Sequence, residues 1–248
     1  MLDALGIRTS SSQDALRFLD ARDGVLSECE ERLRFLESVS GSQTELITFG
    51  DTIILCLELP EATAEESLLP ALGEWLRIVM LSGFSKALRL RGAIAIGEYI
   101  HEGATVLGPA IGDAASWYER VNWMGIVATP SCGHKLTFLK ERIGREKSKP
   151  KAVLHSWFVE YLVPLSDRSQ RTMWSVSWPA QYLSIDAPRT QKMVIVSGAE
   201  LFRYHMSTFA VPLGTEDKYS NTVSFFEWYR ANFPEVRLKL DLSRTSRQ

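Results

Sequence analysis

The stretch Leu46-Ile-Thr-Phe-Gly-Asp-Thr-Ile-Ile-Leu-Cys-Leu57 decides the fold of this chain. Two short apolar runs flank Gly50-Asp51, a dipeptide that reverses the Asp-Gly pair common in tight hairpins. The pattern therefore predicts two antiparallel strands joined by a tight turn, with Asp51 at the turn.

The segments around this hairpin predict a sheet covered by helices. Helix-like spacing of apolar residues predicts a helix over 11–40, interrupted at Gly24, and a second helix over about 63–82 that begins at Thr63. The other expected elements are strands at 89–97 and 126–129, a helix from Pro109 to Trp123, β-rich stretches at 155–165 and 172–178, and helices near 197–209 and 218–231. This order indicates an α+β sandwich with helices on a largely antiparallel sheet.

The 248 residues are enough for one large domain. We expect the catalytic core to occupy 1–150, and the strands and helices of 151–248 to complete the same domain, because no Gly/Ser/Pro-rich linker separates the two parts. No internal repeat or low-complexity tract is present.

Composition excludes several classes of protein. The net charge of −2 gives no global basic field for a nucleic-acid partner. Three widely spaced cysteines cannot form a disulfide framework, which favours a reducing compartment. Because no apolar run reaches the length of a membrane span and no signal peptide is evident, we expect a cytoplasmic protein without membrane contact. The basic run at 140–151 is more typical of a solvated loop than of a phosphate-contacting flap.

Four segments in register resemble class III nucleotidyl cyclases. They are Leu2-Asp-Ala-Leu-Gly-Ile-Arg8, Phe49-Gly-Asp-Thr-Ile-Ile-Leu55, Leu90-Arg-Gly-Ala-Ile-Ala-Ile-Gly-Glu98 and Leu107-Gly-Pro-Ala-Ile-Gly-Asp-Ala-Ala115. Their order and spacing match the family over about residues 1–130. The resemblance implies the family's ferredoxin-related sandwich. It also implies an enzyme that closes a nucleoside triphosphate into a 3′,5′-cyclic monophosphate.

The resemblance assigns the metal ligands and the phosphate loop. Asp3 and Asp51 would hold two divalent ions, Mg²⁺ or Mn²⁺, with the backbone carbonyl of Ala4 completing one site. Two bridged metal ions suit this reaction because they activate the 3′-hydroxyl and stabilise the leaving pyrophosphate. The amides of Leu5, Gly6 and Ile7 would face the triphosphate. Sites of this class form across a dimer interface, so a homodimer is implied.

Two residues keep alternative interpretations. Arg91 lies on the strand face that carries small residues, where it would reach a phosphate, or else would form a salt bridge with Glu98 or a helix acid. Phe49 would border the nucleobase, although an aromatic residue in a hairpin strand is more often part of a core. The four histidines are scattered and favour structural roles.

The first strand poses a separate question, since only Met1 and Leu2 precede Asp3. The strand is either very short or begins upstream. A cyclase without it would have an open sheet edge.

Departures from the family pattern argue against adenine. Ile47 and Pro109 stand where adenylate cyclases read the base, and Gly112 and Ser116 stand at the transition-state Asn and Arg positions. The third and fourth segments, with a late Lys218-Tyr-Ser-Asn-Thr-Val-Ser-Phe-Phe226, are most similar to the bacterial pyrimidine cyclases of Pycsar antiphage defence. That subgroup makes cyclic UMP or cyclic CMP, which activates a separate effector, and we expect UTP to be favoured over CTP. The alternatives are a degenerate cyclase fold kept for nucleotide sensing or dimerisation, and an adenylate cyclase with unusual base contacts.

Overall fold

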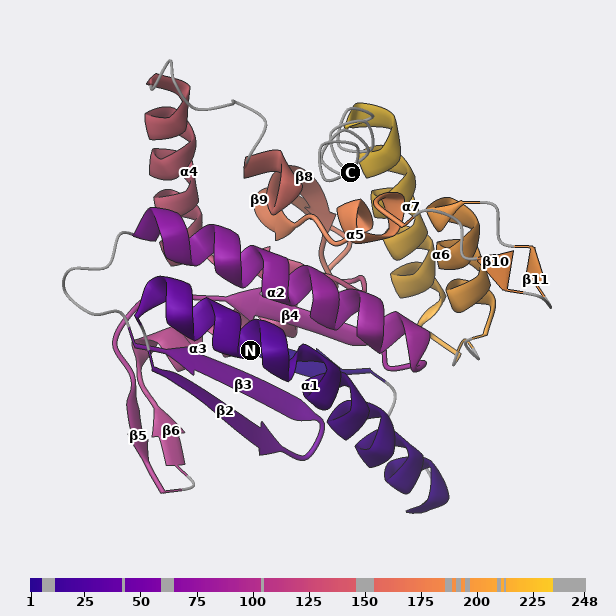
Figure 1. The fold of residues 1–248 in the computed structure, drawn as a ribbon, viewed down its shortest axis with the longest axis horizontal. Coiled ribbons are helices and arrows are strands. Elements are labelled where there is room, and N and C mark those ends of the chain that lie inside the picture. The colour runs from indigo at the N-terminus through magenta and orange to yellow at the C-terminus, as the bar shows by residue number, and fades with distance from the viewer. Residues whose placement is uncertain are drawn as a thin grey trace, which may run out of the picture.

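The computed structural model describes residues 1–5, 12–41, 43–58, 65–103, 105–145, 154–185, 189–190, 193–194, 197–208, 211 and 213–233. Its centre is a seven-stranded sheet in the order β2-β3-β1-β4-β7-β9-β8, with helices packed against it (Figure 1). Neighbouring strands of this sheet are antiparallel except for β4 and β7, which are parallel. The predicted α+β class and the largely antiparallel sheet are therefore confirmed.

The first six elements follow the order β-α-β-β-α-β. They are β1 (Leu2–Ala4), α1 (Ser12–Ser40), β2 (Thr44–Phe49), β3 (Thr52–Leu57), α2 (Glu65–Ser85) and β4 (Leu90–Ile94). Their strands lie in the order β2-β3-β1-β4, which is the split βαβ arrangement. The predicted hairpin is confirmed, because Phe49 pairs with Thr52 and Gly50 has the positive φ of 58° that a tight turn requires.

The first strand is present as β1, so the open sheet edge that we would expect of a cyclase without it does not arise. β1 lies in the interior of the sheet, between β3 and β4, and the edges are β2 and β8. The close approach of β1 to β4 depends on Gly92, because a Cβ there would lie 2.5 Å from Leu2 Cδ2 and 2.6 Å from the Met1 carbonyl oxygen.

The rest of the chain extends the same sheet. A small hairpin, β5 (Ile100–Glu102) and β6 (Thr105–Leu107), projects from the body of the protein (Figure 1). The later elements are α3 (Pro109–Tyr118), β7 (Ile126–Ala128), α4 (Pro130–Arg145), the 3₁₀ turn η1 (Leu154–Ser156), β8 (Phe158–Pro164), β9 (Gln170–Val176), α5 (Pro179–Leu183), β10 (Arg189–Thr190), β11 (Met193–Val194), α6 (Gly198–Ser207) and α7 (Glu216–Asn232). β8 and β9 join the sheet beside β7.

Apart from shifts of a few residues at element ends, three parts of the chain differ from the sequence-based prediction. α1 continues through Gly24. The missing side chain makes room for Lys86, whose Cε lies 3.3 Å from the place that a Cβ on Gly24 would occupy. α3 ends at Tyr118 rather than Trp123, because the next residues turn to bond the β8 end, with Asn122 N donating to Pro164 O. The part of the basic run from Lys140 to Arg145 is the end of α4 rather than a loop. The rest of that run lies outside the described residues.

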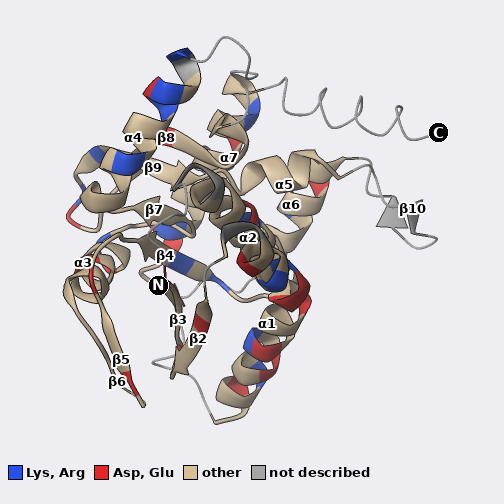
Figure 2. Cartoon of the chain, turned by 60° about the vertical axis from the view of Figure 1, so that its left-hand side comes forward, with Lys and Arg blue, Asp and Glu red and all other residues tan. Residues whose placement is uncertain are grey.

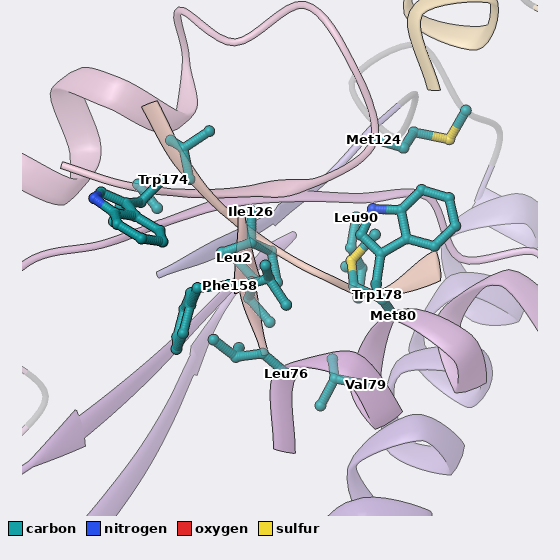
Figure 3. Close-up of a cluster of buried hydrophobic side chains, with 14 of the residues drawn as sticks. Leu2, Leu76, Val79, Met80, Leu90, Met124, Ile126, Phe158, Trp174 and Trp178 are labelled. Atoms are coloured by element: carbon teal, nitrogen blue, oxygen red, sulfur yellow. The ribbon is translucent and has the colours of Figure 1, made fainter. Parts of the chain in front are cut away.

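One hydrophobic core joins the sheet to its helices. Leu2 of β1 lies in it beside Ile126 and Leu76, as Figure 3 shows. Charged side chains are concentrated on α1, which keeps an exposed face (Figure 2). Across the described residues, none of the helices combines the length and the apolar character that crossing a membrane requires.

Candidate functional site

The end of β1 and the turn between β2 and β3 meet at one end of the sheet. Asp3 lies opposite Thr52 in the β1–β3 pair, and Ala4 N donates to Asp51 O at 3.0 Å. The two aspartates are 48 positions apart in the sequence, and the hairpin returns one of them to the other. The structure therefore brings together the two residues that the sequence assigned to metal binding.

The two aspartates have different environments. Asp3 is 5% exposed, whereas Asp51 is half-buried in the turn. A buried carboxylate requires a partner with compensating charge or hydrogen bonds. Asp3 has such a partner in Arg91, which faces it across the β1–β4 pair and donates from Nε to Asp3 Oδ2 at 2.9 Å.

Arg91 is held by three contacts. Besides its bond to Asp3, Nη1 donates to the Glu119 carbonyl oxygen at 3.1 Å, and the guanidinium carbon lies 5.5 Å from the centre of the Tyr118 ring. The salt bridge is the interpretation that the geometry supports, but its partner is Asp3 and not Glu98 or a helix acid. Arg91 is thus a positioning residue for Asp3.

A second cation, Lys218, lies in the electric field of this pair. Burial lowers the pKa of Lys218, the charge of Arg91 lowers it further, and the charge of Asp3 acts in the opposite direction. Burial likewise raises the pKa of Tyr118, and the charge of Asp3 adds to that shift. Lys218, Arg91 and Asp3 therefore form one electrostatic group at the end of the sheet.

The first turns of α7 place Lys218 there. Met124 N donates to Thr222 Oγ1 at 2.8 Å, and Asn221 Nδ2 donates to the Asn122 carbonyl oxygen at 2.8 Å. These bonds attach α7 to the loop that follows α3. The sequence pattern around Lys218 predicts no role for this residue, because nothing local links it to residues near the N-terminus.

Two more arginines border the same end of the sheet. Arg22 of α1 donates from Nη1 to the Gly50 carbonyl oxygen at 3.4 Å and also pairs with Asp23. Arg89 lies 5.9 Å from the Tyr219 ring centre, and its carbonyl oxygen accepts from Leu5 N at 2.9 Å. Cations from several parts of the chain thus lie near this end of the sheet, where they would favour an anionic ligand.

The remaining predicted residues have mixed outcomes. Ala4 is buried and Leu5 is half-buried, both beside the aspartates, whereas Gly6 and Ile7 lie outside the described residues. Phe49 is 82% exposed, so its interpretation as a core residue is wrong. Its ring extends from the last residue of β2, next to the turn that carries Asp51.

The two aspartates would hold a divalent ion only together with oxygen ligands from a substrate or from water. Within the described ranges, no group of three or more His, Cys, Asp and Glu side chains could hold a metal by itself. Mg²⁺ is nevertheless commonly bound by one or two carboxylates together with substrate phosphates and water. Asp3 and Asp51 are two carboxylates of the kind that this pattern uses, and their backbones lie next to each other through the bond from Ala4 N to Asp51 O.

Comparison of the chain with protein-family models, with curated proteins and with solved structures gave no match.

Proposed function

We propose that this chain is a class III nucleotidyl cyclase that closes a pyrimidine nucleoside triphosphate, UTP in preference to CTP, into a 3′,5′-cyclic monophosphate. The observation that carries the proposal is the β1–β3 pairing, which brings Asp3 and Asp51 to one end of the sheet. The β-α-β-β-α-β order around them supports it, because three of the four cyclase-like segments lie on the strands that form this end.

In the proposed reaction the 3′-hydroxyl oxygen attacks the α-phosphorus, its proton passes to solvent, and pyrophosphate leaves. Asp3 and Asp51 would hold the divalent ions, and those ions would supply the activation of the hydroxyl and the neutralisation of the leaving group. Arg91 keeps the Asp3 carboxylate oriented through its 2.9 Å bond. Lys218 and Arg22 add positive charge where the triphosphate would lie.

The proposed enzyme acts as a homodimer. A second copy carries the same Gly112 and Ser116, so the dimer does not restore the hydrogen bonds that the family's Asn and Arg make, and the case for it comes from exposed apolar surface instead. The projecting β5–β6 hairpin offers an apolar contact, since Ile100 and Leu107 pair directly and are 70% and 63% exposed. A pair of apolar side chains in solvent is costly unless a second surface covers it.

The preference for pyrimidines rests on the base-reading positions. Ile47 is half-buried on β2 and Pro109 is exposed at the start of α3, and neither side chain offers a hydrogen bond to adenine. The proposed role is to make a second messenger in antiphage defence, with the product activating a separate effector.

An assay of all four nucleotides tests the proposal. Purified protein is incubated with ATP, GTP, CTP or UTP and Mn²⁺ or Mg²⁺, and the products are identified by mass spectrometry. We expect cyclic UMP as the main product. Cyclic AMP as the main product would establish an adenylate cyclase with unusual base contacts, and no cyclic product from any nucleotide would reject the enzyme.

A nucleotide-sensing module without catalysis is the second candidate. The observation that favours it is the Asp3–Arg91 ion pair, which already neutralises one of the two carboxylates. In that case UTP binding measured by calorimetry would be strong while no turnover occurs, and Asp51→Asn would leave the affinity for UTP unchanged in the absence of metal.

A further inference from the structure

β2 is one of the two edge strands of the seven-stranded sheet. It pairs with β3 from Thr44 to Phe49, and among the described residues no strand lies on its other side. Figure 1 shows β2 at the rim of the sheet. An edge strand presents a row of backbone N–H and C=O groups, which makes it a place where another strand can pair.

The pairing with β3 shows which backbone groups of β2 face outward. Glu58 N donates to Gln43 O at 3.1 Å, so the backbone groups of Gln43 are directed toward β3. Because backbone groups of an antiparallel strand alternate between its two sides, every second residue after Gln43 is directed the same way. The N–H and C=O groups of the residues in between, Thr44, Leu46 and Thr48, therefore point away from β3.

β8, the other edge strand, is protected at its C-terminal end. Leu165 N donates to Ser169 O across the turn to β9, so by the same alternation Pro164 is directed outward. Pro164 has no N–H to offer, and its carbonyl oxygen already accepts from Asn122 N at 2.9 Å. Proline and covering loops of this kind commonly keep edge strands from pairing with other chains.

β2 does not have this protection. Its sequence, Thr-Glu-Leu-Ile-Thr-Phe, contains neither proline nor lysine. The one charged residue in it is Glu45, whose Oε1 lies 2.5 Å from His101 Nδ1 of β5. Side chains alternate between the two faces of a strand, so Glu45 and Leu46 lie on opposite faces. The residues that direct backbone groups outward are thus all uncharged, and Leu46 is 36% exposed.

The three outward-directed residues are spaced symmetrically about Leu46. When two copies of one strand pair antiparallel about a two-fold axis, the same surface is used on both copies. With Leu46 opposite Leu46 of the second copy, Thr44 lies opposite Thr48 at both ends, and all three residues form hydrogen-bonded pairs. Glu45 then lies opposite Ile47 of the second copy, so like charges do not face each other.

We propose that β2 is a self-association surface at which two copies of this chain pair antiparallel, with Leu46 on the two-fold axis. A second copy is favoured over an unrelated strand because the edge is complementary to itself in a register that pairs all of its outward-directed residues. The surface is distinct from the β5–β6 hairpin of the proposed cyclase dimer, and the inference does not rest on the proposed function. Strands of six residues bury less area than a standard interface, so the dissociation constant should be roughly 10–100 µM.

Opposite charges at the two-fold axis test this register. Leu46→Lys and Leu46→Glu are each made in the full chain that also carries Ile100→Ser and Leu107→Ser, so that the apolar pair of the hairpin is absent. Sedimentation equilibrium then measures association over concentrations that bracket the expected dissociation constant. We expect the parent protein to associate, each charged variant alone to associate at least about tenfold more weakly, and an equal mixture of the two to regain the affinity. A monomeric parent, or a mixture that associates no better than its components, would overturn the proposal.

Leu162→Lys is the matched control for the charged variants. Leu162 is 49% exposed and lies on β8, the other edge strand of the sheet. A lysine there should leave the association unchanged, because the proposed contact involves β2 alone. If Leu162→Lys weakened the association as much as Leu46→Lys does, added charge in general would be the cause and the role of the β2 edge would be rejected.

Removal of one outward-directed donor tests the backbone pairing. Thr48→Pro deletes the N–H of Thr48, which points away from β3, so the bonds between β2 and β3 are kept. Thr48→Val is its control, since valine keeps the N–H and a similar shape. We expect the proline variant to associate about tenfold more weakly than the valine variant, with unfolding temperatures within about 3 °C of each other. A folded proline variant that associates as strongly as the valine variant would overturn hydrogen bonding across the β2 edge.

Discussion

Two regions of this molecule, which we call the charged end and the aromatic end, differ in the kind of side chain that they bury. At the end of the sheet near β1, charged groups gather: Asp3 is buried against Arg91, with Lys218 close by. Beneath α5, α6 and α7, aromatic rings gather instead, and Phe202 stacks on Phe226 with ring centres 4.1 Å apart. Burying charge opposes folding, whereas burying aromatic area drives it. The aromatic cluster thus offsets a site whose charges are costly to fold.

The difference extends to polar atoms. At the sheet end, the buried carboxylate of Asp3 has a charged partner, since Arg91 donates to it at 2.9 Å. In the aromatic cluster, the indole Nε1 of Trp178 is buried without a hydrogen-bond partner among the described residues. The packing of aromatic rings can compensate for one unmade hydrogen bond of a neutral group, whereas a buried charge without a partner costs more free energy. We therefore expect substitutions at the sheet end to change activity and those in the cluster to change stability.

The largest expected effect is the loss of cyclisation in Asp51→Asn. The substitution keeps the shape of the side chain but removes a metal-binding charge, so kcat/KM for UTP should fall by roughly 10³-fold or more. Because Asp51 is half-buried in a turn and its backbone oxygen makes the bond to Ala4, the unfolding temperature should stay within about 1 °C of the original.

Asp20→Asn is the matched control for this change, because Asp20 is an exposed acid on α1. It should leave both kcat/KM and stability unchanged. If Asp51→Asn keeps its activity, Asp51 is not part of the site. The contrast between a charged region that serves activity and an aromatic region that serves stability then fails.

Phe226→Ala tests the aromatic end. Phe226 is fully buried and packs on Phe202, Trp178 and Tyr182, so truncation leaves a cavity and should lower the free energy of unfolding by about 3–5 kcal/mol. Urea unfolding followed by tryptophan fluorescence measures the change. Activity per folded molecule should not change. A large fall in kcat with unchanged stability would show that the cluster serves the chemistry after all.

The sequence predicted the parts of the site that local patterns encode. The Gly50-Asp51 turn follows from two flanking apolar runs, and the alternation along β4 places Arg91 beside small residues. The partner of Arg91 was missed because the 2.9 Å bond to Asp3 joins residues 88 positions apart and depends on β1 entering the sheet interior. Lys218 was missed for the same reason. No local spacing encodes how α7 returns to the loop after α3.

Arg91→Gln is expected to have an intermediate effect. It leaves the buried Asp3 carboxylate without its charged partner, so the free energy of unfolding should fall by about 3 kcal/mol in urea titrations. Arg91→Lys keeps the charge but loses the bond to Glu119 and the packing on Tyr118, and about 1 kcal/mol is expected.

The exposed pair of Arg34 and Glu30 provides the control for that series. Arg34→Gln should change the free energy of unfolding by less than about 0.5 kcal/mol, because solvent screens the pair. If Arg91→Gln is as mild as Arg34→Gln, then Asp3 does not depend on Arg91, and the contrast between a costly charged end and a stabilising aromatic end fails.

The smallest expected effect belongs to Lys218→Gln. Lys218 contributes positive charge beside Asp3 and Arg91 without bonding to either in the structure, so it should act on the bound triphosphate rather than on folding. We expect KM for UTP to rise about tenfold with kcat changed less than about twofold, and stability to stay the same.

Lys140→Gln, on α4 and paired with Glu160, is the distant lysine control. A loss of stability with unchanged KM would instead make Lys218 part of the anchoring of α7, and the charged end would then be limited to the aspartates and Arg91. The steady-state kinetics of these two variants therefore decide how far the site extends into the C-terminal half of the chain.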